Sequence, residues 1–112
     1  MSDDGESKRL GGDVAVAAEV RVSLLDKPLA TARITVIARR EGEIQIEGAK
    51  TAIRRTLEEA AGRVFRRYSL LDIRDSEGRG RLAADLGEEL SDALEAYGLP
   101  LKILMVRVDE VV

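Results

Sequence analysis

Two short stretches decide the fold: Tyr68-Ser69-Leu70-Leu71-Asp72-Ile73 and Tyr97-Gly98-Leu99-Pro100. The first lies between two segments with helical periodicity, residues 50–68 and 76–97. The second ends the later helix, because glycine favours the left-handed backbone at a helix end and proline cannot continue the helix. A nearly continuous apolar segment, Leu101 to Val108, then predicts a strand that is covered on both faces and internal to a sheet.

Each helical segment carries a single apolar face. In residues 50–68 the apolar side chains recur at i, i+3, i+4 and i+7, the spacing of an amphipathic helix. Gly62 interrupts this segment, and its missing side chain suggests close approach to a neighbouring element. The second helix begins after Asp75 or Ser76, either of which can cap a helix N-terminus. Residues 76–97 then repeat the apolar spacing with leucine and alanine.

The connection between the helices is too apolar for a plain solvent-exposed loop. Leu70, Leu71 and Ile73 are therefore expected to be buried and to close one end of the core. Under this hypothesis Leu71→Ala costs about 2–5 kcal/mol of stability. Tyr68 and Tyr97 stand at the helix ends, where we expect the rings to pack on the core while the hydroxyl groups stay near water.

In the N-terminal half of the chain, the sequence predicts β-strands. Residues 13–25 and residues 29–39 alternate apolar and polar side chains, so each predicts a half-buried strand. The intervening Asp26-Lys27-Pro28 has turn chemistry, which makes the pair an antiparallel hairpin. Ile37 is an apolar exception on the outer face of the second strand. Glu43 to Ile46 is expected to add a short third strand.

The element order is therefore β-β-(β)-α-α-β, which predicts an α+β fold. We expect a two-layer sandwich in which a small, mainly antiparallel sheet is covered on one face by two helices. Residues 1–12 are polar and are expected to form a disordered tail or a cloning remnant. Residues 13–112 are expected to form a single domain.

The composition excludes several classes of function. The chain has no Cys and no His and a net charge of −3, so we expect no triad hydrolase, no transition-metal site, no cofactor and no enzymatic role. Three aromatic residues and an acidic balance argue against nucleic-acid binding. No apolar run is long enough for a membrane span, and the N-terminus lacks the apolar core of a secretory signal.

Two smaller motifs have competing explanations. Asp72 and Asp75 form an acidic pair, which can perform acid–base chemistry or hold a hard cation, but helix capping explains both residues more simply. The segment Gly78-Arg79-Gly80 is expected to be a flexible helix entry, because it lacks the flanking strand and the ending of a phosphate-binding loop.

Charge is segregated between the two helices. Residues 50–68 carry six basic and two acidic side chains, and residues 76–97 carry two basic and six acidic ones. One interpretation is a self-complementary surface, with the basic helix of one chain meeting the acidic helix of the next around an apolar centre at Ile37. The alternatives are solvated faces, ion pairs within one molecule, or phosphate binding by the arginines. The residues expected to form the surface are Arg54, Arg55, Arg63, Arg66, Arg67, Glu88, Asp92 and Glu95.

Several of these features together resemble the SPFH or band 7 family (stomatin, prohibitin and flotillin). The matching residues are Ala52-Ile53-Arg54, the stretch from Tyr68 to Ile73, Tyr97-Gly98-Leu99 and the closing strand. Residues 75–82 also resemble the flagellar basal-body FliL family, whose periplasmic domain is similar to the SPFH fold. The family's N-terminal membrane segment and long coiled coil are missing here, so we expect an excised domain, a small stand-alone relative or an engineered chain.

The resemblance implies a non-enzymatic scaffold that self-associates, since the family forms rings, or that docks a membrane-protein partner. It implies a membrane-proximal location, cytoplasmic or periplasmic. A FliL-like periplasmic domain associated with the flagellar stator is one alternative. The other is a small α+β domain that binds a ligand or nucleic acid.

Overall fold

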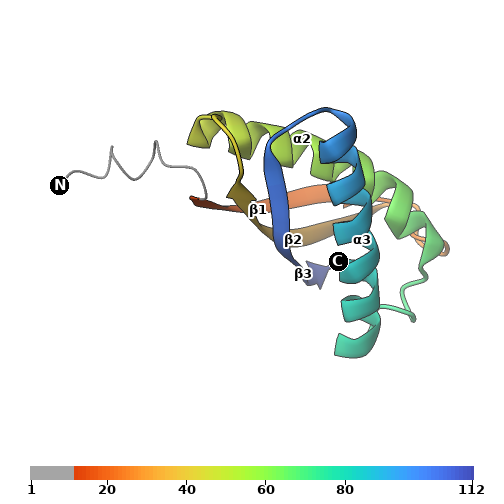
Figure 1. The fold of residues 1–112 in the computed structure, drawn as a ribbon. Helices are drawn as coiled ribbons and strands as arrows, with labels where there is room; N and C mark the ends of the chain where they lie inside the picture. Colours follow the sequence, from red (N-terminus) through yellow and green to blue (C-terminus); the bar gives the residue numbers. More distant parts are fainter. Residues whose placement is uncertain (1–11) are drawn as a thin grey trace.

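The computed structural model describes residues 12–112. In chain order its elements are β1 (Asp13–Val22), β2 (Ala30–Arg40), α2 (Ile46–Val64), the short 3-10 helix η1 (Phe65–Arg67), α3 (Ser76–Ala96) and β3 (Leu101–Val111) (Figure 1). The tail expected over residues 1–12 lies outside the described residues except for Gly12. That residue belongs to the end of the sheet, because its carbonyl accepts a hydrogen bond from the Arg40 N–H at 2.9 Å.

The sheet is a three-stranded antiparallel sheet in the order β1-β2-β3. Alternate side chains of β2, namely Ala32, Ile34, Val36 and Ala38, are completely buried against the helices. Thr31, Arg33, Thr35, Ile37 and Arg39 alternate with these residues and point to the opposite, uncovered face. The α+β fold with two helices on one face of an antiparallel sheet is therefore confirmed.

The helices complete a single core. Every fourth residue of α3 from Leu82 to Leu94 is a buried leucine, so one stripe of this helix faces the sheet. Helix α2 packs over β1, α3 packs over β3, and the two helices contact each other. Phe65 in η1 is the largest of the fully buried side chains. Gly98 ends the α3 turn with φ of 70°, the left-handed conformation that the sequence predicts.

The third strand expected at Glu43 to Ile46 is wrong. Helix α2 begins at Ile46, before the expected start at Lys50, and the Ala49 N–H already donates to the Gln45 carbonyl at 2.8 Å. The preceding loop is held by Arg40, whose Nη1 donates to the Ile44 carbonyl at 3.2 Å. Four residues with two isoleucines fit the first turn of a helix as well as a strand, so the alternation could not separate them.

The internal position expected for the closing strand is also wrong. Strand β3 pairs with β2 and with no other described strand, so it is an edge strand. Leu101 and Val108 are buried toward α3, but Leu104 and Met105 are 40% and 37% exposed. The apolar run therefore does not come from burial on two faces. It includes residues at an edge that the described chain leaves uncovered.

The connection between the helices is buried only in part. Ile73 is buried as expected, but Leu70 is exposed and Leu71 is 68% exposed, so the burial expected for both leucines is wrong. Ser69 and Asp72 exchange hydrogen bonds between backbone N–H and side-chain oxygen, at 2.9 and 3.1 Å. This tight turn sends the two leucines outward while Ile73 points inward.

Three further expectations are settled at the helix ends. Asp75 caps α3, because its Oδ1 accepts from the Gly78 N–H at 2.7 Å. The packing expected for Tyr97 is wrong, since it is 59% exposed, whereas Tyr68 is half-buried. Gly62 makes no close approach, because a side-chain carbon added there would have no neighbour within 4 Å.

Candidate interaction surface

The charged side chains of α2 and α3 meet partly within the same chain. Glu89 of α3 lies between Arg63 of α2 and Arg67 of η1, 3.0 Å from Arg63 Nε and 3.5 Å from Arg67 Nη2. The hydrogen bond from Arg63, followed by the charges of both arginines, holds the pKa of Glu89 below its usual value. Arg63 and Arg67, which belong to the predicted surface, therefore pair with Glu89 inside one chain. The sequence interpretation did not identify Glu89 as their partner.

Two tyrosines strengthen the same seam between α2 and α3. The Tyr68 hydroxyl donates to Asp85, and the Tyr97 hydroxyl donates to Glu59 at 2.7 Å. Burial, followed by the hydrogen bond to Asp85, raises the pKa of Tyr68 to about 12. The hydrogen bond to Glu59 likewise raises the pKa of Tyr97. Both hydrogen bonds therefore tie the α3 segment to the α2–η1 segment within one chain.

The other predicted surface residues lie away from this seam. Arg54 and Arg55 on α2 and Arg66 on η1 are exposed and make no ion pair with any other residue of 12–112. The acidic residues expected on the surface are all exposed on α3 and share no ion pair with described residues; they are Glu88, Asp92 and Glu95. The structure thus separates the predicted basic and acidic groups onto different flanks of the helix pair.

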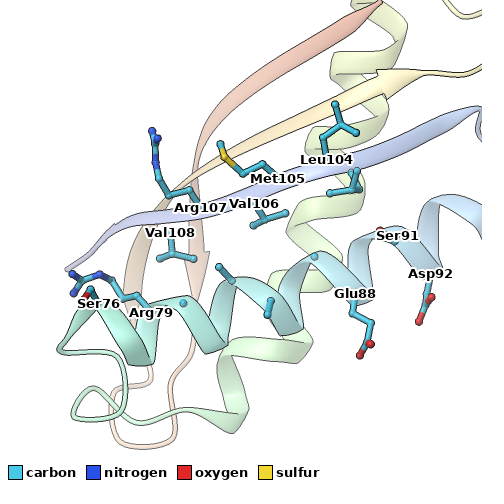
Figure 2. Close-up of a pocket in the computed structure, with 15 residues that line it drawn as sticks. Ser76, Arg79, Glu88, Ser91, Asp92, Leu104, Met105, Val106, Arg107 and Val108 are labelled. Atoms are coloured by element: carbon cyan, nitrogen blue, oxygen red, sulfur yellow. The ribbon is translucent and has the colours of Figure 1, made fainter. Parts of the chain in front are cut away.

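A groove runs between α3 and the free edge of β3 (Figure 2). It has a volume of about 730 Å³, and β3 contributes Ile103 to Val108 to its lining. The α3 side is built mainly from residues with no side chain or a very small one: Gly80, Ala83, Ala84, Gly87 and Ser91. Because these positions are short, the flank of α3 leaves room beside the strand.

The ends of the groove carry opposite charge. Arg79 and Arg107 line the end nearest Val108, and Glu88 and Asp92 line it toward the other end, pointing away from the strand (Figure 2). Arg79 is also structural, because its Nη1 donates to the Ile73 and Arg74 carbonyls at 3.3 and 2.9 Å. The segment Gly78-Arg79-Gly80, expected to be a flexible helix entry, is therefore a first turn of α3 that is fixed by hydrogen bonds. Glu88 and Asp92 are the predicted surface residues that the structure places at the groove.

The backbone of β3 is available for pairing along this edge. Thr31 and Val112 exchange both backbone hydrogen bonds, at 2.8 and 2.9 Å. Every second residue of β2 from Thr31 onward therefore points its N–H and C=O groups toward β3. Met105 and Arg107, which pair with such residues, direct their backbones back at β2. Val106 lies between them and directs its N–H and C=O outward, because antiparallel pairing alternates along a strand.

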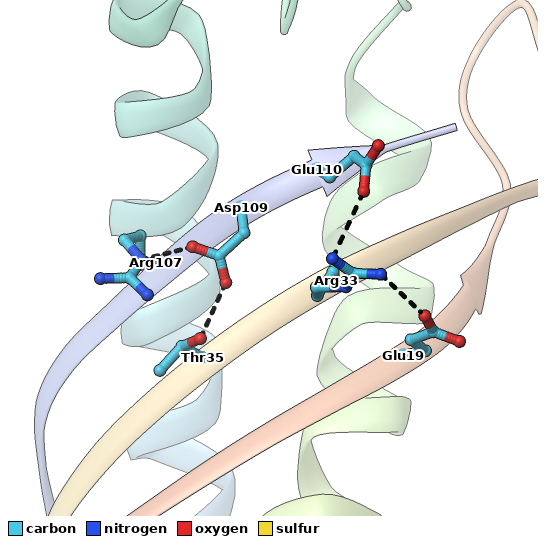
Figure 3. A network of polar contacts seen from close by, with 6 residues as sticks. All are labelled: Glu19, Arg33, Thr35, Arg107, Asp109 and Glu110. Atoms are coloured by element: carbon cyan, nitrogen blue, oxygen red, sulfur yellow. Dashed lines mark hydrogen bonds and ion pairs between the residues drawn. The ribbon is translucent and has the colours of Figure 1, made fainter.

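The uncovered face of the sheet is mostly ionic (Figure 3). Arg33 lies 3.3 Å from Glu19 on β1 and 3.6 Å from Glu110 on β3. Asp109 accepts from the Thr35 hydroxyl at 2.8 Å and pairs with Arg107, and these hydrogen bonds lower the pKa of Asp109. Cross-strand pairs of opposite charge suit a solvated sheet face.

The apolar centre expected at Ile37 is narrow. Its neighbours across the sheet are Ala15 on β1 and Met105 on β3, and Ile37 itself is only half-buried. One row of three apolar side chains lies among charged rows on this face, so the groove offers more continuous apolar surface than the face around Ile37 does.

A second apolar surface lies at the tip formed by two loops. The Leu25 N–H donates to the Tyr68 carbonyl and the Leu70 N–H donates to Asp26 Oδ1, both at 2.9 Å. These bonds hold the turn between β1 and β2 against the connection between α2 and α3. Leu25, Leu70 and Leu71 are exposed at this tip, as is Leu29 farther along the turn. The sequence interpretation missed the tip because it placed two of these leucines in the core.

The acidic pair serves the local backbone. Asp72 holds the turn with Ser69, and the backbone hydrogen bond from Ser69 lowers the pKa of Asp72. Asp75 caps α3. Among residues 12–112 no group of three acidic side chains gathers in a way that could hold a metal ion. In the same range, no helix has the length and apolar character needed to cross a bilayer.

The chain matches no protein-family model and no curated protein. The SPFH resemblance therefore stays a prediction. The sequence interpretation missed the groove itself, although the small residues of α3 recur at helical spacing and the Ile-Leu-Met-Val of β3 carries no charge. Both signals were present, but the apolar run was read as buried.

Proposed function

We propose that this chain is a non-enzymatic interaction module that self-associates through the groove between α3 and β3. The observation that carries the proposal is the position of β3, which has the composition of an internal strand but lies at an edge. Natural edge strands are usually short, charged or covered, because their open backbone groups recruit other strands. Ile103 to Val106 carries no charge and its free edge pairs with no described strand, and the one irregularity in this segment is the register shift with β2 at Leu104.

The SPFH resemblance supports the same role, because that family forms rings. It also makes a membrane-complex protein the expected further partner, as a FliL-like domain would require. The absence of His and Cys from the chain supports the non-enzymatic part of the proposal.

The test measures mass against concentration for two matched variants. Leu104→Lys places a charge on the free edge of β3, and Leu71→Lys makes the same change on the apolar tip. Both leucines are exposed, so neither substitution should unfold the chain. We expect the wild type and Leu71→Lys to associate with rising concentration in sedimentation velocity, while Leu104→Lys stays monomeric.

Three other outcomes count against the proposal. A wild type that is monomeric at every concentration would refute self-association. Association that survives Leu104→Lys but is lost in Leu71→Lys would move the interface to the tip. Loss in both variants would indicate nonspecific hydrophobic association, which has no defined surface. Circular dichroism of each variant, with urea unfolding, confirms that the monomer remains folded.

A further inference from the structure

We infer that the partner in the groove is a second copy of this chain, whose β3 pairs antiparallel with β3 about a two-fold axis at Val106. This inference rests on the proposed function and specifies its geometry. The result is a continuous six-stranded sheet in a closed dimer, in which the same patch of each chain faces itself.

The backbone of β3 places the axis. Val106 directs its N–H and C=O away from β2, so two copies of this residue can exchange both hydrogen bonds. The pairing of β3 with β2 skips one residue on each side of Val106, namely Leu104 and Asp109. One skipped residue lies on each side of the axis, two residues before Val106 and three residues after it, so Lys102 and Glu110 both remain on the uncovered face, opposite Arg39 and Arg33 of β2. Leu104, which is exposed in one chain, then lies beside the β3 strand of the other chain.

The charges of β3 favour the antiparallel register. Lys102 and Glu110 lie four residues to either side of Val106, so the axis brings Lys102 of each chain opposite Glu110 of the other. Both side chains are exposed. Lys102 has no ion pair among residues 12–112, and Glu110 shares only Arg33, at 3.6 Å. A parallel arrangement would instead place like charges side by side, which is unfavourable.

The helices fit the same axis. A two-fold axis perpendicular to the sheet makes the two α3 helices antiparallel neighbours, so the Arg79 end of one lies beside the Glu88 and Asp92 end of the other. The flanks that meet are the short side chains of the groove, including Ala84 and Gly87. Small residues let two helices approach to about the lower end of the usual 8–10 Å spacing. Longer side chains there would block the dimer.

This arrangement differs from the head-to-tail contact expected from the segregated helix charges. A contact between α2 of one chain and α3 of the next joins two different surfaces and continues into a ring or filament. The pairing of Arg63 and Arg67 with Glu89 inside one chain leaves that contact fewer free charges. The two-fold contact stops at two chains.

The test exchanges charge across the axis. Lys102→Glu alone and Glu110→Lys alone each place like charges opposite each other twice per dimer, so each should weaken dimerisation by roughly tenfold or more at low salt. The two single variants mixed together have both pairs restored, and so does the double variant Lys102→Glu/Glu110→Lys. We expect both to dimerise within about threefold of the wild type.

A matched control removes the other ion pair of Arg33. Glu19→Lys reverses a charge on the same sheet face, 3.3 Å from that arginine, but on β1. It should leave the dimerisation constant unchanged. A steric pair tests the helices: Ala84→Trp in the groove should abolish the dimer, whereas Ala96→Trp at the end of α3 should not.

The outcomes separate this inference from the proposed function. If the wild type never associates, both fail. If it associates but the mixed and double variants stay as weak as the single ones, the register is wrong and self-association stands. If the wild type grows beyond two chains and the triple reversal of Arg63, Arg66 and Arg67 to Glu stops that growth, the head-to-tail arrangement replaces this one.

Discussion

Gly78→Ala should unfold the start of α3 far more than a single methyl group suggests. A side-chain carbon at this position would overlap the Asp72 carbonyl oxygen and lie 2.8 Å from the carbonyl carbon and 3.1 Å from Asp75 Oδ1. The obstacle is backbone, so it cannot rotate away. The turn at Asp72 must lift, and with it the Asp75 cap and the buried Ile73.

The magnitude follows from three contributions. Overpacking of a closed site costs about 1–3 kcal/mol, and loss of the N-cap costs about 1 kcal/mol. The better helix propensity of alanine stabilises the helix by about 1 kcal/mol and offsets part of this loss. The expected net loss is about 1–3 kcal/mol, which corresponds to a fall in Tm on the order of 10 °C for a domain of this size.

Urea unfolding followed by circular dichroism measures this loss, and two matched glycines provide the control. Gly80 in the same helix and Gly62 in α2 have no neighbour within 4 Å of an added side-chain carbon. The same substitution there should stabilise the chain by up to about 1 kcal/mol. The reasoning is refuted if Gly78→Ala is as stable as the wild type, or if all three variants change stability in the same direction.

The remaining predictions concern pH and the connection between the helices. Because the pKa of Tyr68 is raised from 10.0 to about 12 in the folded state, its contribution to stability is complete below pH 10 and is lost as pH rises toward 12. Thermal melts of Tyr68→Phe should therefore lose less stability over that window than the wild type does. Because the pKa of Glu89 is lowered in the folded state, its ionised carboxylate stabilises the fold above pH 4.5, and this stability is lost as pH falls through the folded-state pKa. Thermal melts of Glu89→Gln should therefore depend less on pH in the acid range than those of the wild type. Leu71→Ala should cost less than about 0.5 kcal/mol in urea unfolding, since the side chain is exposed. Ile73→Ala should cost about 2–5 kcal/mol, and equal losses at the two positions would contradict the observed burial.

The regular elements were predictable because their patterns are long. Ten residues of β1 and eleven of β2 keep a period of two, and the leucine stripe of α3 repeats over several turns. Each such pattern has a single backbone geometry that buries all its apolar residues together. The boundary signals at Asp75 and Gly98 have specific stereochemical causes, and the structure has both.

Short apolar segments were not predictable in the same way. Ile44 and Ile46 fit either a strand or a helix start, and Leu70 and Leu71 follow a turn whose direction is set by hydrogen bonds between Ser69 and Asp72. Position in the sheet is a property of the whole topology. The composition of β3 therefore could not show that the strand lies at an edge.

The candidate surface was predictable in part. Glu88 and Asp92 lie at the groove, but Arg63 and Arg67 turn toward Glu89 in the same chain. Helical spacing assigns residues to a face of one helix. It does not say which face a second helix covers, so the distinction between an internal ion pair and an external one required the packing of α2 on α3.

Hydrogen exchange at the Val106 amide tests the central claim most directly. In a single chain this N–H points away from β2, whereas the amides of Met105 and Arg107 point toward it. If β3 pairs with β3 of a second copy, the Val106 amide should become protected as concentration rises and should exchange freely on dilution, while its two neighbours stay protected throughout. A Val106 amide that exchanges freely at concentrations where the chain is associated would contradict the account.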